Sequence, residues 1–207
     1  QKLIIFPTFE SLEQQYAKED IDRVEDVILN SIDQLDRQLY DWSDWDDTYH
    51  FIENLNDDYI DNNLSPDIFS NLQVNLVYFL DNDFEPVWAQ TYSFDIEHPD
   101  QVEITTNTEN VQQSLELLQH EFEKLKLRTS DNYQSINGLF SQHDSPIAFA
   151  IHPIINSNKD SIGYLIFGRT LEQFIIKKFG EQINKAFKIE VMTKKPLSMS
   201  DFSNNYY

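Results

Sequence analysis

The residues best suited to bind a small molecule form one acidic and aromatic run, Asp41–Tyr49, with the sequence Asp-Trp-Ser-Asp-Trp-Asp-Asp-Thr-Tyr. If the run is helical, four of its side chains fall at i, i+3, i+4 and i+7 on one face: Trp42, Trp45, Asp46 and Tyr49. Two indoles and a phenol around one carboxylate would form an aromatic wall with a fixed acceptor, suited to an amine or a polar organic ligand. The alternative is that the aromatic rings only anchor the helix in the core, while Asp46 bonds to nearby backbone.

Arg169 is the basic residue that we expect to complete this site. Residues 169–187 are predicted to form a helix, which Arg169 would begin directly after a strand. Its guanidinium could then pair with Asp46 or hold an anionic ligand. The alternative is an ordinary surface ion pair. The predicted ligand site therefore consists of Trp42, Trp45, Asp46, Tyr49 and Arg169.

Other patterns that could carry chemistry are weaker. Four aspartates in the run could suggest paired carboxylates for glycoside hydrolysis, but acids so close in sequence are typical of a solvated helix face. Residues 163–170 have the spacing of a phosphate-binding loop, yet their Tyr-Leu-Ile-Phe interior is typical of a strand. Five His without paired spacing and the absence of Cys indicate no metal-ligand set. The acids at 57–61 and 81–83 favour loops and turns over a calcium site. We therefore expect no catalytic residue, no metal and no cofactor.

A long helix should position the acidic and aromatic run. From about residue 9 to about residue 52 there is no Pro or Gly, and apolar residues recur at helical spacing. A helix of about 40 residues would be about 60 Å long. Because one small globule cannot cover that length, we expect part of the helix to pack against its twin in a homodimer.

An antiparallel sheet is predicted after this helix. Period-two alternation indicates two hairpins and a fifth strand, at residues 74–80 with 86–92, 147–153 with 162–168, and 188–193. Further helices are expected at residues 65–72, 111–127 and 169–187. Since the order lacks βαβ alternation, we predict an α+β fold with a long N-terminal helix packed on a five-stranded antiparallel sheet with flanking helices.

The composition is that of a folded and strongly acidic domain. The chain of 207 residues has 36 acidic and 15 basic residues, a net charge of −21, and 40% hydrophobic residues. This apolar content is too high for a disordered tail, and a nucleic-acid partner would require clustered Lys and Arg. No apolar window is long enough to span a bilayer. The apolar start, Leu3–Phe6, could nevertheless be the end of a removed membrane anchor, so we interpret the chain as a piece of a longer protein.

Three stretches of the sequence resemble a known family of sensor domains. The first leads through residues 9–24 into 39–52 and contains the Asp-Trp-x-x-Trp-Asp-Asp-Thr-Tyr run; the others are residues 57–64 and residues 146–154 with 162–169. In these stretches the sequence resembles the extracellular CHASE sensor domains, specifically the fourth class of that family. The resemblance covers about residues 9 to 180, although residues 95–145 match nothing in it.

The resemblance implies the PAS-like sheet of the Cache group and a non-catalytic sensory module between two membrane helices of a bacterial or archaeal receptor. Relatives carry histidine-kinase or cyclic-dinucleotide (diguanylate cyclase) output domains in the cytoplasm. We therefore expect one extracytoplasmic sensor domain over residues 1–207, in a membrane protein anchored by flanking helices. It would comprise the helix to residue 53, a PAS/Cache-like body at 54–193 and an unassigned tail at 194–207.

The expected function is ligand sensing. An unknown small molecule, enclosed by the sheet and residues 95–145, would change how the long helix seats on the sheet, and the helix would carry the change towards the membrane. Two alternatives stay open: a protein-interaction module of the same fold without a small ligand, and a carboxylate-dependent hydrolase.

Overall fold

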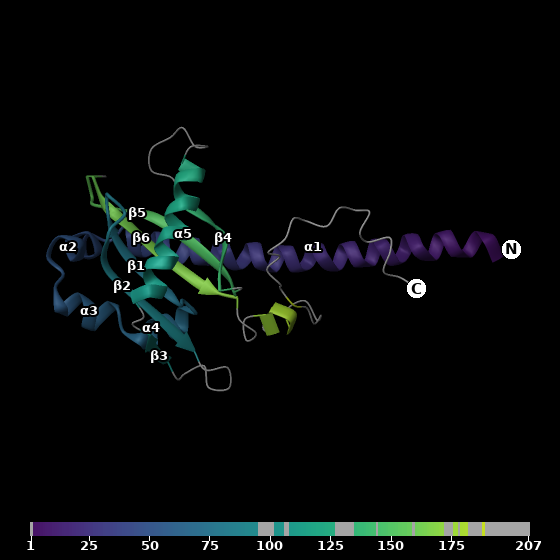
Figure 1. The fold of residues 1–207 in the computed structure, drawn as a ribbon, viewed down its shortest axis with the longest axis horizontal. Helices are drawn as coiled ribbons and strands as arrows, with labels where there is room; N and C mark the ends of the chain where they lie inside the picture. The colour runs from purple at the N-terminus through teal and green to yellow at the C-terminus, as the bar shows by residue number, and fades with distance from the viewer. Residues whose placement is uncertain are drawn as a thin grey trace.

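A computed structural model describes residues 2–94, 102–105, 108–126, 135–143, 145–158, 160–171, 176–177, 179–181 and 188. In these parts of the chain, five helices and six strands follow one another (Figure 1). The helices are α1 (Lys2–Ser43), α2 (Asp46–Asn54), α3 (Asp57–Asn63), α4 (Pro66–Leu72) and α5 (Thr108–Lys126). The strands are β1 (Leu76–Asp81), β2 (Pro86–Phe94), β3 (Val102–Thr105), β4 (Ile136–Gln142), β5 (Ser145–Ile155) and β6 (Ser161–Thr170).

The six strands form one sheet in the order β3-β2-β1-β6-β5-β4, and every neighbouring pair is antiparallel. Both predicted hairpins are confirmed, as β1–β2 and β5–β6, and they join where β1 pairs with β6. The predicted α+β architecture is therefore confirmed, but the number of strands is not. The predicted fifth strand, 188–193, lies outside the described residues except for Lys188, and the prediction missed both edge strands.

The missed strands, β3 and β4, lie in the segment 95–145 that the sequence suggested only as a cover. Asn137-Gly138 in β4 resembles turn chemistry, yet both residues lie in the ladder opposite β5. Gly138 is tolerated there because β4 is an edge strand that pairs with one neighbour among the described strands. Strand pairing thus overrode the local turn preference.

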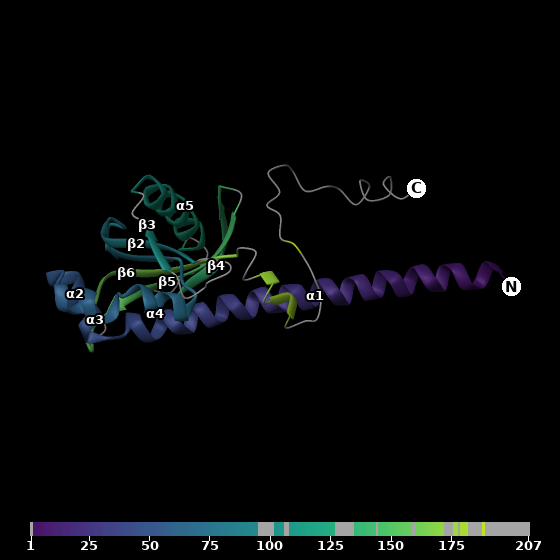
Figure 2. The same ribbon diagram turned by 90° about the horizontal axis from the view of Figure 1, so that it is seen from below.

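Helices cover both faces of the sheet. Figure 2 shows α1 to α4 on one face and α5 on the other. On the α1 face, Leu35 and Leu39 are fully buried, and the small residues Ala148 and Ala150 of β5 allow the helix to approach the sheet closely. On the opposite face, α5 confirms the helix predicted at 111–127 and buries a row of apolar side chains against the sheet: Leu115, Leu118 and Phe122.

The first helix extends well beyond the sheet (Figures 1 and 2). Its described side chains that face the sheet are buried from Ser31 and Ile32 onward, whereas Tyr16 and Ile21 are 62% and 65% exposed. The prediction of one helix through residue 52 is wrong, because α1 ends at Ser43 and α2 begins at Asp46. Within the described residues, no helix is both long and apolar enough to cross a membrane.

The C-terminal part of the chain differs from its prediction in one respect. Arg169 and Thr170 belong to β6 and do not begin a helix, because the ladder with β5 continues to Thr170. Residues 176–177 and 179–181 are helical, in agreement with part of the predicted helix at 169–187. The predicted division of the chain into a helix to residue 53, a body at 54–193 and a tail at 194–207 stays a prediction.

Candidate functional site

The acidic and aromatic run forms a corner between two helices. The Asp44 N–H still donates to Tyr40 O, but Trp45 has extended backbone angles (φ −83°, ψ 132°) and is the N-cap of α2. Thr48 and Tyr49 donate their N–H groups to Trp45 O and so close the first turn of α2. The four predicted site residues therefore do not share one helical face.

The two tryptophans of the corner stack on each other but differ in exposure. Trp42 is 9% exposed and contacts the rings of Phe69 and Phe167, with centroids 5.7 and 5.6 Å away. Trp45 is 43% exposed, and its indole lies 5.4 Å from that of Trp42 with an interplanar angle of 21°. Trp42 thus anchors the corner in the core, and Trp45 presents an aromatic surface to solvent.

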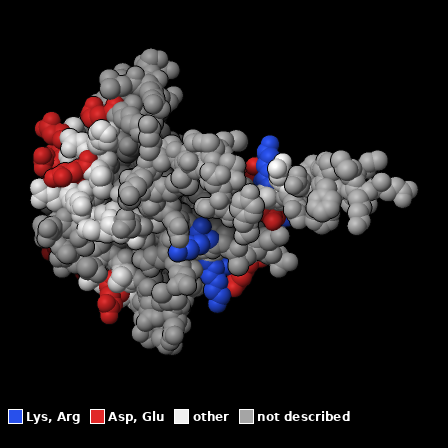
Figure 3. Space-filling view, turned by 45° about the vertical axis from the view of Figure 1, so that its right-hand side comes forward, with Lys and Arg blue, Asp and Glu red and all other residues white. Residues whose placement is uncertain are grey.

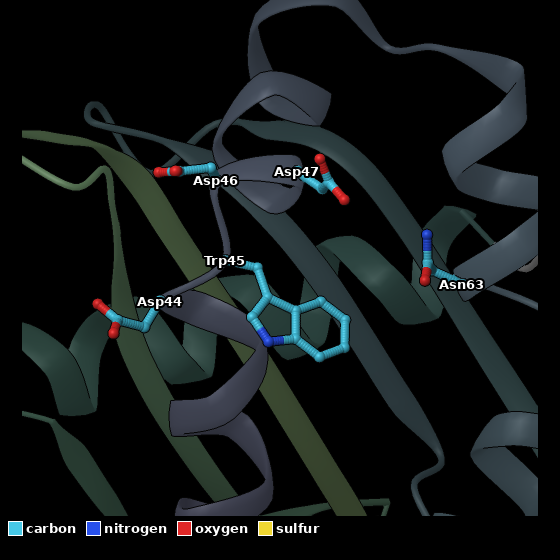
Figure 4. A pocket seen from close by; sticks show the side chains of 5 residues that line it. All are labelled: Asp44, Trp45, Asp46, Asp47 and Asn63. Atoms are coloured by element: carbon cyan, nitrogen blue, oxygen red, sulfur yellow. The ribbon is translucent and has the colours of Figure 1, made fainter.

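An open hollow of about 500 Å³ lies against this surface. It is lined by Asp44, Trp45, Asp46, Asp47 and Asn63 (Figure 4). Figure 4 shows Asp47 and Asn63 on one side of the indole, while Asp44 and Asp46 point to the other side. Since three carboxylates and no basic residue line the hollow, it favours a cationic ligand.

The acidic character of the hollow is part of a wider pattern. Figure 3 shows a group of carboxylates at the end of the molecule away from the projecting part of α1. The few basic side chains visible in this view lie nearer the middle of the molecule and the projecting helix. Such a distribution raises the local concentration of cations at that end of the molecule.

Asp46 fastens the corner to the turn between β5 and β6. Its Oδ1 accepts the Ser157 backbone N–H at 3.2 Å, and the Ser157 hydroxyl donates to the same carboxylate, 2.8 Å from Oδ2. The prediction that Asp46 pairs with Arg169 is wrong, because the Arg169 guanidinium donates its hydrogen bonds to residues of α1 and to the end of α4. The helical spacing of the Asp41–Tyr49 run could not predict the roles of Ser157 and Asn63, because both residues lie far from the run in the sequence.

Arg169 lies inside the protein rather than in the hollow, with 3% exposure. Its Nε donates to Gln73 O at 2.9 Å and its Nη2 to Leu72 O at 2.9 Å, at the C-terminal end of α4. Its Nη1 donates to Ser31 Oγ at 2.8 Å, and Nη2 also reaches Gln38 Oε1 at 3.5 Å, both on α1. Burial lowers the pKa of Arg169 to about 10, so the group stays charged at neutral pH. Arg169 therefore ties α1 and α4 to the sheet.

Tyr49 does not line the hollow, because it is half-buried and packs against the core on the α1 face. Its neighbour Thr48 is fully buried and shares a 2.7 Å hydrogen bond with the Tyr59 hydroxyl. Of the predicted site residues, the structure brings only Trp45 and Asp46 into the hollow, with Trp42 directly behind Trp45.

The other functions considered for the acidic residues can also be compared with the structure. Asp41, Asp44, Asp46 and Asp47 are all exposed, which does not suit the partly buried acid of a glycoside hydrolase. Asp81 Oδ1 accepts the N–H groups of Asp83 and Glu85 and so holds the β1–β2 turn. Within the described part of the chain, no group of three or more His, Asp or Glu is arranged to hold a metal ion.

The sequence matches the CHASE4 domain over residues 27–190, which is most of the chain and includes the corner, the hollow and the whole sheet. The chain belongs to the CHASE4 family. CHASE4 domains are non-catalytic sensor modules on the outer side of the cell membrane, so this chain is an extracytoplasmic sensor domain of a membrane receptor. The predicted family and location are thereby confirmed.

Solved structures similar to this CHASE4 domain are also sensor domains. The extracellular domain of vpHK1S-Z8, which is named as a histidine kinase, has a TM-score of 0.52 and 15% identity, with 80% of this chain and 60% of that domain covered. The periplasmic domain of Vibrio cholerae LuxQ has a TM-score of 0.45 and 12% identity, with coverages of 86% and 80%. The sensor domain of E. coli DcuS has a TM-score of 0.41 and 10% identity, with coverages of 75% and 98%.

The first of these likenesses shows a shared fold. This CHASE4 domain spans about 60% of the length of the vpHK1S-Z8 domain. A comparison of the sequence with curated proteins finds no match.

Proposed function

We propose that this CHASE4 domain senses a small organic cation, which binds in the hollow beside Trp45, and that α1 transmits the binding event to a cytoplasmic output domain. The output would be a histidine kinase or a cyclic-dinucleotide enzyme, as in relatives of the family. The observation that carries the proposal is the stack of Trp45 on Trp42. Trp42 belongs to the core between α1 and the sheet. A ligand that contacts Trp45 would therefore act, through the stacked Trp42, on the packing of α1 against the sheet.

The lining of the hollow supports the ligand class. An indole face attracts an ammonium or quaternary ammonium group through its π-electrons, and Trp45 is exposed enough to be reached. Asp44 and Asp46 on one side and Asp47 on the other would balance the positive charge. The Asn63 amide adds a neutral polar group for a hydroxyl or carbonyl of the ligand.

Signalling requires that the ligand favours one of two arrangements of the corner. The bond between Asp46 and Ser157 supplies such a choice, since Asp46 can bind the β5–β6 turn or a cation but not both at full strength. A ligand that binds the Asp46 carboxylate would weaken its hydrogen bonds to the β5–β6 turn. The packing of the C-terminal end of α1 against β5 and β6 would then change.

We also propose that the receptor is a homodimer through α1. Ile21 is exposed and Val24 half-exposed, and with the half-buried Ile28 they continue the stripe that α1 buries on its own sheet from Ile32 onward. A second copy could cover the continuation of this stripe by helix pairing.

Replacing Asp46 by Asn tests the ligand site. Asn keeps an acceptor for Ser157 but loses the charge, so the fold should persist while the response to ammonium probes is lost. In thermal shift with choline, ethanolamine and putrescine, an active probe at about 100 times its Kd should stabilise the wild type by about 2.7 kcal/mol. That corresponds to a rise in Tm of about 5–10 °C, and Asp46→Asn should show less than about 2 °C.

The exposed Asp67→Asn in α4, which is not in the lining, is the matched control and should keep the full shift. If Asp46→Asn unfolds the protein, the run is a structural joint. If no probe shifts the wild type, the protein-interaction alternative gains weight, because exposed Trp45 and Leu55 (46%) beside an open hollow would also suit a protein partner.

Ser157→Ala tests the switch between turn and ligand. The change removes the hydroxyl donor to Asp46 but no charge, so the probe that binds the wild type should bind the variant about two- to fivefold more tightly, consistent with loss of one competing hydrogen bond. Isothermal titration calorimetry measures this ratio. Weaker binding in Ser157→Ala would mean that the turn supports the site instead of competing with the ligand.

A further inference from the structure

The first helix is tied to the sheet by polar contacts on two flanks. On one flank, Arg169 of β6 donates to Ser31 and Gln38 of α1. On the other flank, His152 of β5 contacts Asp36 of α1, with 3.0 Å between Nε2 and Oδ1. Asp36 and Gln38 are two residues apart, so their side chains project from opposite sides of the helix. The two ties differ in kind, because arginine stays charged at physiological pH whereas an imidazole titrates between about pH 5 and 8.

His152 lies in an enclosed position between α1 and β5. Its side chain is 8% exposed and that of Asp36 is 23% exposed. The Tyr40 ring, one helical turn beyond Asp36, makes a T-shaped contact with the imidazole, with ring centroids 5.9 Å apart. A carboxylate and a phenol from two successive turns of α1 thus hold the imidazole.

Asp36 is the charged group that faces His152. The neighbours of His152 on the same side of β5 and its partner in β6 are apolar: Ala150, Ile154 and Leu165. Strand β4, on the other side of β5, contains no titratable residue. The other charged residues near Asp36 on α1 are exposed: Asp33 and Arg37. On α2, the ionisable side chains have other surroundings: Asp46 bonds to Ser157, Asp47 lines the hollow, and Tyr49 and Glu53 contact His50.

The contact between His152 and Asp36 strengthens when the imidazole binds a second proton. A carboxylate can only accept, so Nε2 carries a hydrogen and donates to Oδ1, and Nδ1 is the nitrogen that titrates. Before it takes up the proton, the ring that faces the Asp36 charge is neutral. Afterwards both partners are ionised, and Coulomb attraction adds to the hydrogen bond. The net charge of −21 also favours proton uptake over the whole domain.

We propose that His152 is a proton-binding site through which the pH outside the cell changes how α1 packs on the sheet. Proton uptake draws α1 towards β5 at Asp36, while the tie to Arg169 on the other flank stays the same, so the helix tilts. The domain lies on the outer side of the membrane and is therefore exposed to the pH of the surroundings. This input does not require the hollow at Trp45, but its effect on an output domain rests on the proposed transmission through α1.

The first test compares melting temperatures at pH 5.5 and pH 7.5. His152→Gln keeps an N–H donor but cannot bind a proton. Because the stabilisation is present at low pH and is lost as the pH rises, the Tm loss of His152→Gln relative to wild type should be about 2–4 °C larger at pH 5.5. His50→Gln is the matched control, since His50 also lies 3.0 Å from a carboxylate, that of Glu53, but in an exposed pair; its Tm loss should differ by less than about 1 °C between the two pH values. A Tm loss of His152→Gln that is the same at both pH values would overturn the proposal.

A second variant assigns this pH dependence to the pair. Asp36→Asn keeps an acceptor for the imidazole but removes the charge, so it should lose the same pH-dependent stabilisation as His152→Gln. At pH 5.5 the double variant should lose less Tm than the sum of the two single variants, because both remove the same interaction. Losses that add at pH 5.5 would mean that the two side chains act independently, which contradicts the proposal.

The third test measures whether the proton moves α1. The chain has no Cys, so spin labels on Lys18→Cys and Asp83→Cys, both at exposed positions, report the distance from the projecting part of α1 to the β1–β2 turn. With labelled protein diluted in unlabelled protein, this distance should change by about 2 Å between pH 7.5 and pH 5.5, as for a tilt of about 5° over about 27 Å of helix. The change should be absent in His152→Gln, and an unchanged distance in the wild type would refute the proposal. Asp46→Asn should keep the change, so failure of this proposal and failure of the cation site are distinguishable.

Discussion

Replacement of Arg169 by Ala is expected to lower the free energy of unfolding by roughly 3–5 kcal/mol, because each buried acceptor left without a donor costs about 1–3 kcal/mol. The guanidinium satisfies Leu72 O and Gln73 O at the end of α4 and holds Ser31 and Gln38 of α1. Without it, two backbone carbonyls lose donors and a cavity opens where α1, α4 and β6 meet. Urea unfolding followed by tryptophan fluorescence measures the loss.

Two variants show whether this loss comes from the fork of hydrogen bonds. Arg169→Lys keeps the charge but cannot donate in the same directions, so it should recover only part of the stability. Arg23→Ala removes an exposed arginine whose ion pair with Asp20 is 3.4 Å long, and its effect should stay within about 0.5 kcal/mol. An unfolding midpoint of Arg169→Ala equal to that of the wild type would contradict the role of Arg169 as the tie between the helices and the sheet.

Gly163→Ala should be similarly damaging, with a loss of about 3 kcal/mol or more, at the upper end of overpacking effects. A Cβ at this position would lie 2.0 Å from Leu80 O, and that oxygen belongs to the backbone of the neighbouring strand β1. A backbone carbonyl cannot rotate away as a side chain can, so β1 and β6 would have to separate. Their pairing joins the two hairpins, and its weakening should therefore affect the whole sheet.

Gly138→Ala is the matched control on the same sheet. Its Cβ would lie 3.4 Å from Phe149 Cε1, an ordinary contact with the end of a side chain. The backbone at Gly138 does not have a positive φ, so Ala fits and should be neutral or stabilising by up to about 1 kcal/mol. Circular dichroism melts of both variants make the comparison. If the Tm of Gly163→Ala equals that of Gly138→Ala and of the wild type, the close approach of β6 to β1 is not essential for stability.

The hairpins could be predicted because apolar runs of strand-forming residues bounded by turn residues act locally. Val77 and Phe79 face the α1 side while Tyr78 and Leu80 face α5, and because helices cover both faces, the whole run is apolar. The edge strand β4 could not be predicted, since its Asn137-Gly138 pair favours a turn and only pairing with β5 makes it extended.

The candidate site could be predicted in part. The Asp41–Tyr49 run contains four of the five residues that line the hollow, all except Asn63, but no Pro or Gly marks the break between the helices at Trp45. Burial of Trp42 at the end of α1 and of Phe51 in α2, against Tyr59 and Phe79, fixes the corner instead. The position of Arg169 was missed because its acceptors on α4 are backbone carbonyls, which no residue type signals in advance.

The extension of α1 past the sheet gives the domain mechanical leverage. The helix begins at Lys2, so about 30 of its residues precede the buried Ser31, a distance of about 45 Å at 1.5 Å per residue. A tilt of about 5° at the seat of the helix would move its far end by about 4 Å over that length. A small change in the packing of α1 on the sheet would thus displace the N-terminal end of α1 by most of the rise of one helical turn.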